Sequence, residues 1–168
     1  MGETASTAND IATLLQRELE GFSREVSLFH DDLSLWATVP GVANSAGNLA
    51  LHVSGNLRHF IGAVLGGDGY VRDRESEFGR RSGTREEVIS EIQRTADSVR
   101  KTLGEFPERR MAEDFPELVM GMRLRTSLFL LHLCAHAGFH LGQAGYLRRI
   151  VTGESLTSGP LPLKPLGS

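Results

Sequence analysis

The segment TSLFLLHLCAHAGFHLGQAGYLRRIV, residues 126–151, is the part of this chain from which the rest can be interpreted. It is long and mostly apolar, and it carries His132, His136 and His140 four residues apart. Residues four apart lie above one another on an α-helix, so the three imidazoles are predicted to form one stripe. Two imidazoles one turn apart can bind the same divalent ion, as on the helix of zinc proteases. The segment therefore predicts a helix that supplies part of a metal site.

A third metal ligand has to come from another element, and His52 is the best candidate. It lies in GNLALHVSGNLRHF, residues 47–60, which has the pattern of a second helix. Three neutral imidazoles leave the charge of the ion intact and leave positions open for water or substrate. Structural zinc sites usually contain cysteine, so an all-histidine site favours catalysis.

The spacing alone does not decide which histidines bind. His132 and His136 are as far apart as His136 and His140, so either pair fits. Histidines that only pack and hydrogen-bond in a core are the plainer interpretation, because a single buried histidine is more often structural than a ligand. Burying several imidazoles without partners costs about 1–3 kcal/mol each, which favours a shared ion over a chance stripe.

Apolar residues at alternating steps of three and four predict three further helices. The first is expected from Asp10 to Trp36, and the second from Ser45 to the glycine pair at 66–67. A capping box, with Thr84 as the N-cap and Glu87 three residues later, starts the third helix, which ends at Gly104. The predicted core positions of the first helix are Leu15, Leu19, Phe22, Val26, Phe29, Leu33 and Trp36.

Four amphipathic helices predict an all-α fold, an antiparallel four-helix bundle. The connection from Glu105 to Gly121 is expected to cross from one end of the bundle to the other before the last helix. Gly153 is expected to end that helix, so we predict one domain over residues 1–153 and a proline-rich tail over 154–168. Residues 1–9 are small and polar, which predicts a frayed arm.

A polar stripe of His52, Asn56 and His59 runs along the second predicted helix, flanked by Gly55 and Gly62. Each glycine costs a helix about 1 kcal/mol relative to alanine. That cost is easier to understand where a backbone or a ligand approaches closely. Close packing of another helix explains the two glycines equally well.

Charged residues crowd the loop GGDGYVRDRESEFGRRSG, residues 66–83. The ligand spacing and the terminal glutamate of a calcium loop are missing from it. A solvated loop is the plainer interpretation. The alternative is that the loop forms part of a mouth over the bundle, since long loops are disproportionately functional.

The pattern HAGFHLGQAGYLRR, residues 136–149, together with His52 on an earlier helix, resembles the DinB-like superfamily of four-helix metalloproteins. In that superfamily one histidine of the second helix and an H-x-x-x-H pair on the last helix bind a zinc- or nickel-type ion. The most recognisable piece is H-x-G-Q, spelled HLGQ at residues 140–143, and residues 44–67 resemble one branch of the superfamily. Phe139 departs from the pattern, because many relatives carry a further histidine there.

The resemblance assigns the metal ligands to His52, His136 and His140. His132 is then expected one turn deeper, as a core residue or a group behind the ligands. Asn56 and Gln143 are polar neighbours that can fix a water molecule or an imidazole tautomer.

Two residues outside the ligand set also have predicted roles. His59 is too far along its helix to share the ion, and we expect it to relay a proton at the mouth; the plainer interpretation is a solvated helix residue. Cys134 lies about 200° around the helix from His132, so we expect a packed core thiol and no ligand.

The composition excludes several classes of protein. A net charge of −3 argues against nucleic acid as a main partner. Cys134 is the single cysteine, which excludes an intrachain disulfide framework and favours a reducing cytoplasm. No basic-then-apolar signal segment opens the sequence, and no apolar run reaches the roughly 18 residues of a membrane span, so secretion and membrane insertion are not expected.

The resemblance implies two classes of function. One is a metal-dependent enzyme, a thiol transferase or a hydrolase, that activates a low-molecular-weight thiol or water toward a small-molecule substrate. The other is a metal-binding stress or interaction protein without turnover. A plain helical dimerisation module with incidental histidines is a third, weaker interpretation. The resemblance also implies a homodimer.

Overall fold

The computed structural model describes residues 6–159 and 162–166, and all regular elements in these ranges are helical apart from two isolated β-bridges. The all-α class is therefore confirmed. The long elements are α1 (Thr7–Ser27), α3 (Ala46–Leu57) continued by the π-helix η1 (Arg58–Leu65), α5 (Arg85–Gly104) and α6 (Thr126–Thr152). The short ones are α2 (Asp32–Leu35), α4 (Arg74–Gly79) and the 3₁₀-helices η2 (Glu108–Ala112) and η3 (Lys164–Leu166).

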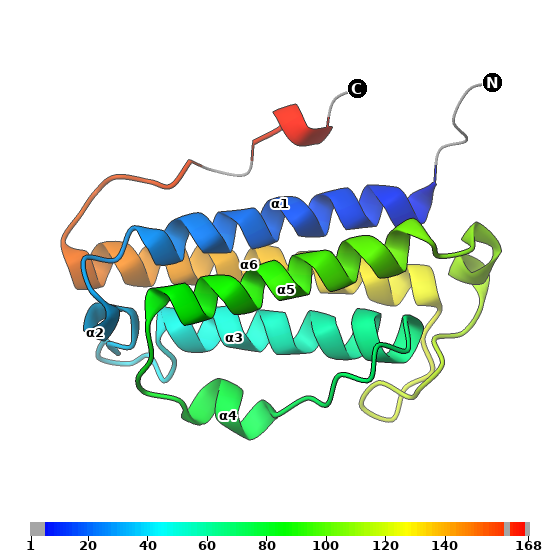
Figure 1. The fold of residues 1–168 in the computed structure, drawn as a ribbon, viewed down its shortest axis with the longest axis horizontal. Helices are drawn as coiled ribbons and strands as arrows, with labels where there is room; N and C mark the ends of the chain where they lie inside the picture. Colours follow the sequence, from blue (N-terminus) through cyan, green and yellow to red (C-terminus); the bar gives the residue numbers. More distant parts are fainter. Residues whose placement is uncertain (1–5, 160–161, 167–168) are drawn as a thin grey trace.

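The four long elements lie side by side and form a helical bundle around one apolar core (Figure 1). α1 packs against α5 and α6, and α3 packs against the same two helices. Followed along the chain, α1 and α6 run in one direction and α3 and α5 in the other (Figure 1). The pairs α1–α5 and α3–α6 are therefore antiparallel, whereas α1–α6 and α3–α5 are parallel. The arrangement is not antiparallel throughout.

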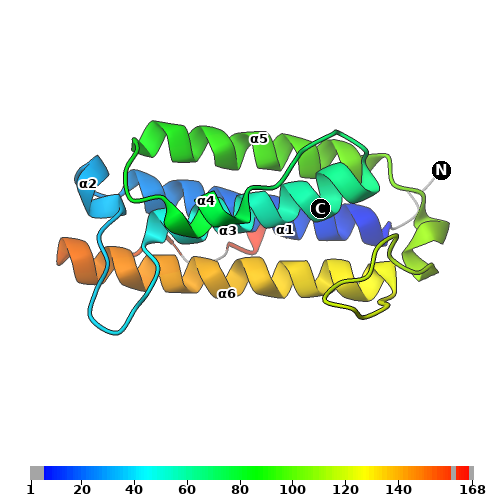
Figure 2. The ribbon, with the colours of Figure 1, turned by 90° about the horizontal axis from the view of Figure 1, so that it is seen from below.

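The long crossing connection precedes α5, and the prediction that it precedes the last helix is wrong. Because α3 and α5 run in parallel, residues 66–84 have to return along the whole bundle, and they carry α4 on the way (Figures 1 and 2). The segment 105–125 stays at one end, where α5 finishes and α6 begins (Figure 1). It folds back on itself through bridges between Asp114 and Arg125 and between Val119 and Met122. Its length is used in this hairpin-like turn and not in crossing the bundle.

The first predicted helix is interrupted, which corrects its predicted end at Trp36. α1 begins earlier than expected, with Ser6 as its N-cap, and ends at Ser27. Asp31 then caps α2 through a reciprocal hydrogen-bond pair with Ser34, and this local turn competes with continuation of the helix. The predicted core residue Leu33 is consequently 81% exposed. The other six predicted core positions are buried: Leu15, Leu19, Phe22, Val26, Phe29 and Trp36.

The other predicted helix ends agree closely with the structure. Ser45 and Thr84 form capping boxes at the starts of α3 and α5. Gly153 ends α6 in a left-handed conformation with φ of 72°. These ends follow from local hydrogen bonding, so they can be inferred from a few residues.

A buried ion pair joins the ends of α1 and α6 and holds the start of the tail. Arg148, 1% exposed, donates from Nε to Glu25 Oε2 at 2.5 Å and from a terminal nitrogen to the carbonyl of Leu156. Ser158 Oγ donates to the other carboxylate oxygen of Glu25. The tail therefore packs on the bundle up to this point, and the domain boundary at 153 stays a prediction.

Part of the sequence lies outside the described residues. Of the predicted frayed arm, residues 1–5 are not described and residues 7–9 are helical, as are residues 164–166 of the tail. In residues 6–159 and 162–166, no helix is both long enough and apolar enough to cross a bilayer.

Candidate metal centre

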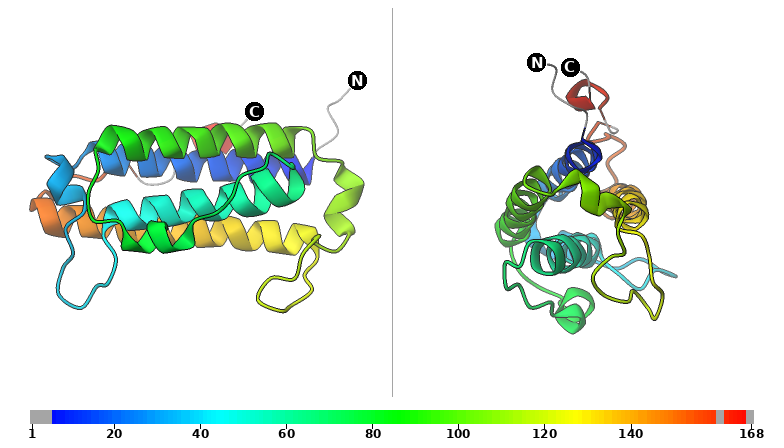
Figure 3. Two further views of the ribbon diagram at one scale, coloured as in Figure 1. Left: turned by 60° about the horizontal axis from the view of Figure 1, so that its bottom comes forward. Right: turned by 90° about the vertical axis from the view of Figure 1, so that its right-hand side faces the viewer.

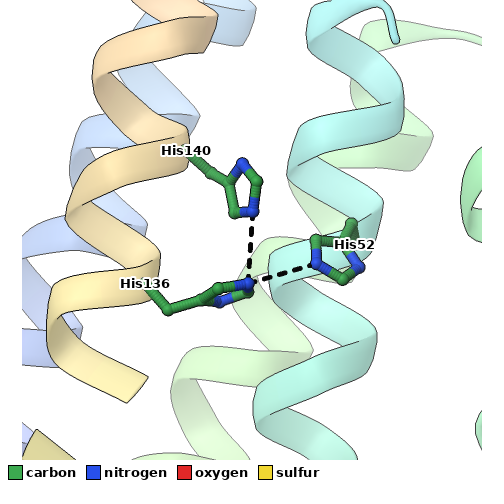
Figure 4. A group of neighbouring side chains, drawn as sticks. All are labelled: His52, His136 and His140. Atoms are coloured by element: carbon green, nitrogen blue, oxygen red, sulfur yellow. Dashed lines mark hydrogen bonds between the residues drawn. The ribbon is translucent and has the colours of Figure 1, made fainter. Parts of the chain in front are cut away.

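The predicted ligand histidines face one another across the antiparallel pair α3–α6. His52 projects from α3, and His136 and His140 project from consecutive turns of α6 (Figure 4). His136 Nε2 lies 3.3 Å from His52 Nε2 and 3.2 Å from His140 Nε2. One ring nitrogen from each residue lies within 4.8 Å of the other two. The three imidazoles thus converge on one point.

These separations match the spacing of nitrogen ligands around one ion. With Zn–N bonds of about 2.0–2.1 Å and tetrahedral angles, two ligand nitrogens are roughly 3.3–3.4 Å apart. The two separations at His136 Nε2 are close to that value. The donor set, three imidazole nitrogens with no thiolate, is that of sites with open coordination positions.

Hydrogen bonds behind the cluster fix how two of the rings are protonated. His52 Nδ1 lies 3.0 Å from Glu77 Oε2, and His140 Nδ1 lies 2.7 Å from Gln143 Oε1. Both oxygens accept, so each Nδ1 carries the proton and each Nε2 presents a lone pair. His136 Nε2, between them, can donate to only one of the two. In the neutral cluster at least one Nε2 lone pair therefore has no hydrogen-bond donor. A cation at the point of convergence would interact favourably with the lone pairs of all three Nε2 atoms.

The two rings on α6 are held in their neutral form. Burial, reinforced by the charges that His140 and His52 would carry, lowers the pKa of His136 to about 4. Burial also lowers the pKa of His140, against the opposing effect of its bond to Gln143. Neutral imidazole is the form that binds metals, because protonation removes the lone pair.

Glu77, a residue that the sequence analysis missed, is the partner of His52. It lies on α4 and is buried, and Arg72 donates to both of its carboxylate oxygens at 2.7 and 2.8 Å. Burial raises the pKa of Glu77, but the hydrogen bonds from Arg72 and His52 outweigh it and hold the pKa below its usual value. The crossing segment 66–84 thus supports the cluster. It lies behind α3, and most of its residues are exposed, as expected of a solvated loop, whereas Glu77 is buried.

The glycine at position 55 makes room for this carboxylate. A Cβ at Gly55 would lie 2.0 Å from Glu77 Oε1, far closer than any Cβ contact allows. At Gly62 a Cβ would meet Asp68 and Ser98 oxygens at 2.5 Å. The two glycines therefore mark the close approach of side chains, and at Gly55 the approaching carboxylate is the one that contacts His52 of the histidine cluster. Gly55, a glycine inside a predicted helix, was therefore the sequence feature that indicated the close approach of another group, here Glu77.

The remaining predicted site residues lie around the cluster. Asn56 is buried one turn from His52, and its Oδ1 has no hydrogen-bond partner among the described residues. Gln143 holds His140, as described above. His59 Nε2 lies 3.1 Å from Glu117 Oε1 on the connection before α6. That histidine is thus paired with a carboxylate and is not part of the cluster.

The structure corrects the expectation for His132. It is exposed, and its ring stacks on Phe129 at 6.1 Å, so it is not a core residue. Its ring centroid is also 6.1 Å from that of His136. Cys134 is half-buried against the core, as expected, and burial together with Glu18 raises its thiol pKa to about 12. A thiol with such a pKa is inert at neutral pH.

The fold and the cluster define a class: a helical bundle with three converging histidines on two facing helices. A family model described as "Protein of unknown function (DUF1572)" matches residues 21–162, and the chain belongs to this family. The family lies within the DinB-like fold family. That placement agrees with the resemblance inferred from the sequence. No curated protein matches the chain.

A solved structure shares the fold. It is described as "Crystal structure of the conserved protein of locus from Enterococcus faecalis", with a TM-score of 0.73 and 15% sequence identity. The match covers 90% of this chain and 100% of that chain. At this identity the likeness concerns the fold alone.

The depressed pKa of His136 predicts a pH dependence of stability. In the unfolded metal-free chain His136 takes up a proton near its ordinary pKa of 6.5, whereas in the folded chain it does so only near 4. Between these values the unfolded state binds more protons, so the free energy of unfolding falls as the pH falls. Urea unfolding of chelator-treated protein at pH 7, 6 and 5 measures this slope.

The His136→Gln variant should show a smaller slope over the same range. His30→Gln is the matched control. His30 is exposed, and it contacts the exposed Glu154 at the surface, far from the cluster. An unchanged slope in His136→Gln would contradict the burial argument.

Proposed function

We propose that this chain is a DinB-like metalloprotein that binds one divalent ion, zinc or nickel, through His52, His136 and His140. The convergence of three Nε2 atoms, two of them with Nδ1 bound to an acceptor, carries this proposal. The Glu77–His52 contact has the form of a carboxylate–histidine–metal arrangement, in which the carboxylate orients the ring and makes its nitrogen more basic. The buried, unpaired Oδ1 of Asn56 adds a polar acceptor beside the site.

The finer proposal is a metal-dependent enzyme that uses a low-molecular-weight thiol or water against a small electrophilic substrate. A bound ion with three neutral ligands supplies Lewis acidity and lowers the pKa of a bound water toward about 7. Arg72 and Glu77 keep His52 in the ligand tautomer, and Gln143 does the same for His140. His59, with Glu117 behind it, is the candidate to accept and pass on a proton.

A non-catalytic metal-binding protein is the second candidate. One observation favours it: His59, the proposed relay, already pairs with Glu117 and lies two turns of helix from His52. Two turns correspond to roughly 10 Å along the axis, so a proton would need at least one bridging water to reach it. Turnover separates the two candidates.

Metal content tests the site. Protein purified without added metal and without a polyhistidine tag is expected to contain one divalent ion per chain by plasma mass spectrometry. Alanine at His52, His136 or His140 should lower affinity by orders of magnitude, since two imidazoles cannot replace three. His132→Ala is the matched control on the same helix, and it should keep the metal. Metal retained in all three ligand variants would refute the site, and loss in His132→Ala and His136→Ala with metal kept in His140→Ala would assign the pair to His132 and His136.

Turnover is tested with a model electrophile, a model ester and a panel of small thiols across pH. We expect turnover that is lost on metal removal and that drops at least ~10²-fold in His59→Ala, the lower range for general acid–base groups. Unchanged turnover in that variant would leave the metal as the sole catalyst. A full metal site without turnover on any of these substrates would favour the binding protein.

The contact between Glu77 and His52 predicts a loss of affinity when it is broken. Glu77→Gln should weaken metal binding about 10–100-fold, the usual effect of removing an outer carboxylate. Gly55→Ala should have a similar effect, because the added methyl displaces the same carboxylate. Competition with a chromophoric chelator measures both. Glu75→Gln is the control, an exposed glutamate on the same short helix. Wild-type affinity in both variants would rule out a supporting role for Glu77.

A further inference from the structure

A cavity of about 420 Å³ lies between the last turns of α6, the start of α3 and the loop 37–45. The loop extends from the bundle beside α6 and contributes one wall of the cavity (Figures 2 and 3). Leu49 and Leu147 are buried and form the floor, whereas Val42 and Ile150 are exposed at the rim. We call this cavity the α3–α6 pocket. Its volume lies within the roughly 300–1,000 Å³ of sites that bind small molecules.

The lining of the α3–α6 pocket is uncharged: none of its nine residues is acidic or basic. A larger cavity of about 670 Å³, between α3, α5 and the crossing segment, is by contrast lined by three arginines and five acidic residues. Bringing a charged group into an uncharged pocket costs free energy unless an opposite charge compensates it. The α3–α6 pocket is therefore suited to an uncharged, mostly apolar molecule.

Two amide side chains line the pocket and can orient such a molecule. The Oε1 atom of Gln143 accepts from His140 Nδ1 at 2.7 Å, which leaves the NH₂ group of the same side chain to donate elsewhere. Asn44 adds a second amide to the wall. A carbonyl oxygen of a ligand can accept from these donors. Apolar walls with a few placed polar groups are the usual form of a small-molecule site.

The α3–α6 pocket lies next to the histidine cluster on the same pair of helices. Leu49 precedes His52 by three residues on α3, and Gln143 follows His140 by three residues on α6. Because the two helices are antiparallel, both steps lead in the same direction along the pair. About one helical turn, roughly 5.4 Å, therefore separates the pocket from the cluster. The hydrogen bond between Gln143 and His140 connects the two.

We propose that the α3–α6 pocket binds an uncharged small molecule with an apolar body and a carbonyl group that accepts a hydrogen bond from Gln143. Such a molecule is an ester, a ketone or an amide, and its apolar body packs on Leu49 and Leu147. Binding to the pocket does not require a metal ion. The role of the bound molecule as the substrate of the histidine cluster rests on the proposed function.

Fluorescence titration of chelator-treated protein with Prodan tests the pocket. Prodan is an uncharged naphthyl ketone whose emission moves to shorter wavelength in apolar surroundings, and we expect saturable binding with such a shift. Methyl naphthoate should displace Prodan. Naphthoate, which differs from the ester by its negative charge, should compete at least ~10-fold more weakly, because the lining contains no cation to compensate that charge.

Two substitutions test whether Prodan binds in the α3–α6 pocket. Gly142→Leu fills the pocket, and a Cβ at Gly142 meets no atom within 4 Å, so the helix can accept it. Ile150→Glu places a charge at the rim. Each should weaken Prodan binding at least ~10-fold with an unchanged helical circular dichroism spectrum. Gly104→Leu and Leu128→Glu are the matched controls, an open glycine of α5 and an exposed leucine of α6 outside the pocket, and both should bind Prodan like the wild type.

The histidine ring signals in an NMR spectrum of the same metal-free protein test the contact with the cluster. Saturating methyl naphthoate is expected to shift the ring signals of His140, because the ester bonds to the side chain that holds this ring. The signals of the exposed His30 should not move. In wild-type protein methyl naphthoate should displace Prodan better than methylnaphthalene, which lacks the carbonyl group. Gln143→Leu should remove this difference, because leucine cannot donate.

Four results overturn the proposal. The first is a wild-type protein that binds no Prodan. The second is equal binding in both pocket variants, which would place the probe elsewhere. The third is equal competition by naphthoate, which would contradict the uncharged ligand class. The fourth is Prodan binding that weakens as the protein concentration rises, which would mean that a second copy covers the pocket.

The role as a substrate site fails separately. Displacement of Prodan by methyl naphthoate without a change in the His140 ring signals would remove the link between the pocket and the cluster. A chain that binds no metal would refute the proposed function alone, because every measurement on the pocket uses metal-free protein.

Discussion

The hydrogen bond between Glu77 and His52 is the interaction on which the candidate site depends. It connects the crossing segment with α3, and Arg72 keeps the carboxylate charged in a buried position. Because the acceptor occupies Nδ1, the lone pair of His52 has to point toward α6. This contact requires glycine at position 55, because any side chain there would occupy the place of the Glu77 carboxylate. A loop that seems peripheral in the sequence thus orients a residue at the centre of the bundle.

The directions of the helices explain why that loop exists. The consecutive long helices α3 and α5 run in parallel, so the connection between them has to be as long as the bundle, whereas α5 and α6 run in opposite directions and are joined at one end (Figure 1). The antiparallel pair contains the three histidines, and the crossing segment covers the opposite side of α3. The site therefore lies between α3 and α6, and the crossing segment supports it from the other side of α3 through Glu77 and His52.

Much of the fold and the convergence of the three histidines could be predicted, because both rest on periodic or local signals. The spacing of His136 and His140 on one helix follows from the geometry of the α-helix, and capping residues such as Thr84 mark helix starts. Glu77 could not be predicted, because its contact with His52 depends on how the crossing segment packs, and many charged residues surround it in the sequence. The exposure of Leu33 and His132 was missed for a related reason. Periodicity gives the relative positions of residues on a helix, but not where the helix stops or how far its neighbours cover it.

The sequence separation of the contacts in the cluster gives an order of assembly. Glu77 is 25 residues from His52, whereas His136 is 84 residues away. Closing the shorter loop costs less chain entropy, so the tautomer of His52 can be set while the last helix is still unattached. The last helix is also made last during synthesis, and it brings two imidazoles already one turn apart. The cluster can therefore form from two parts that are each ordered beforehand: His52 with Glu77, and the histidine pair on α6. The docking of α6 is the step that joins them.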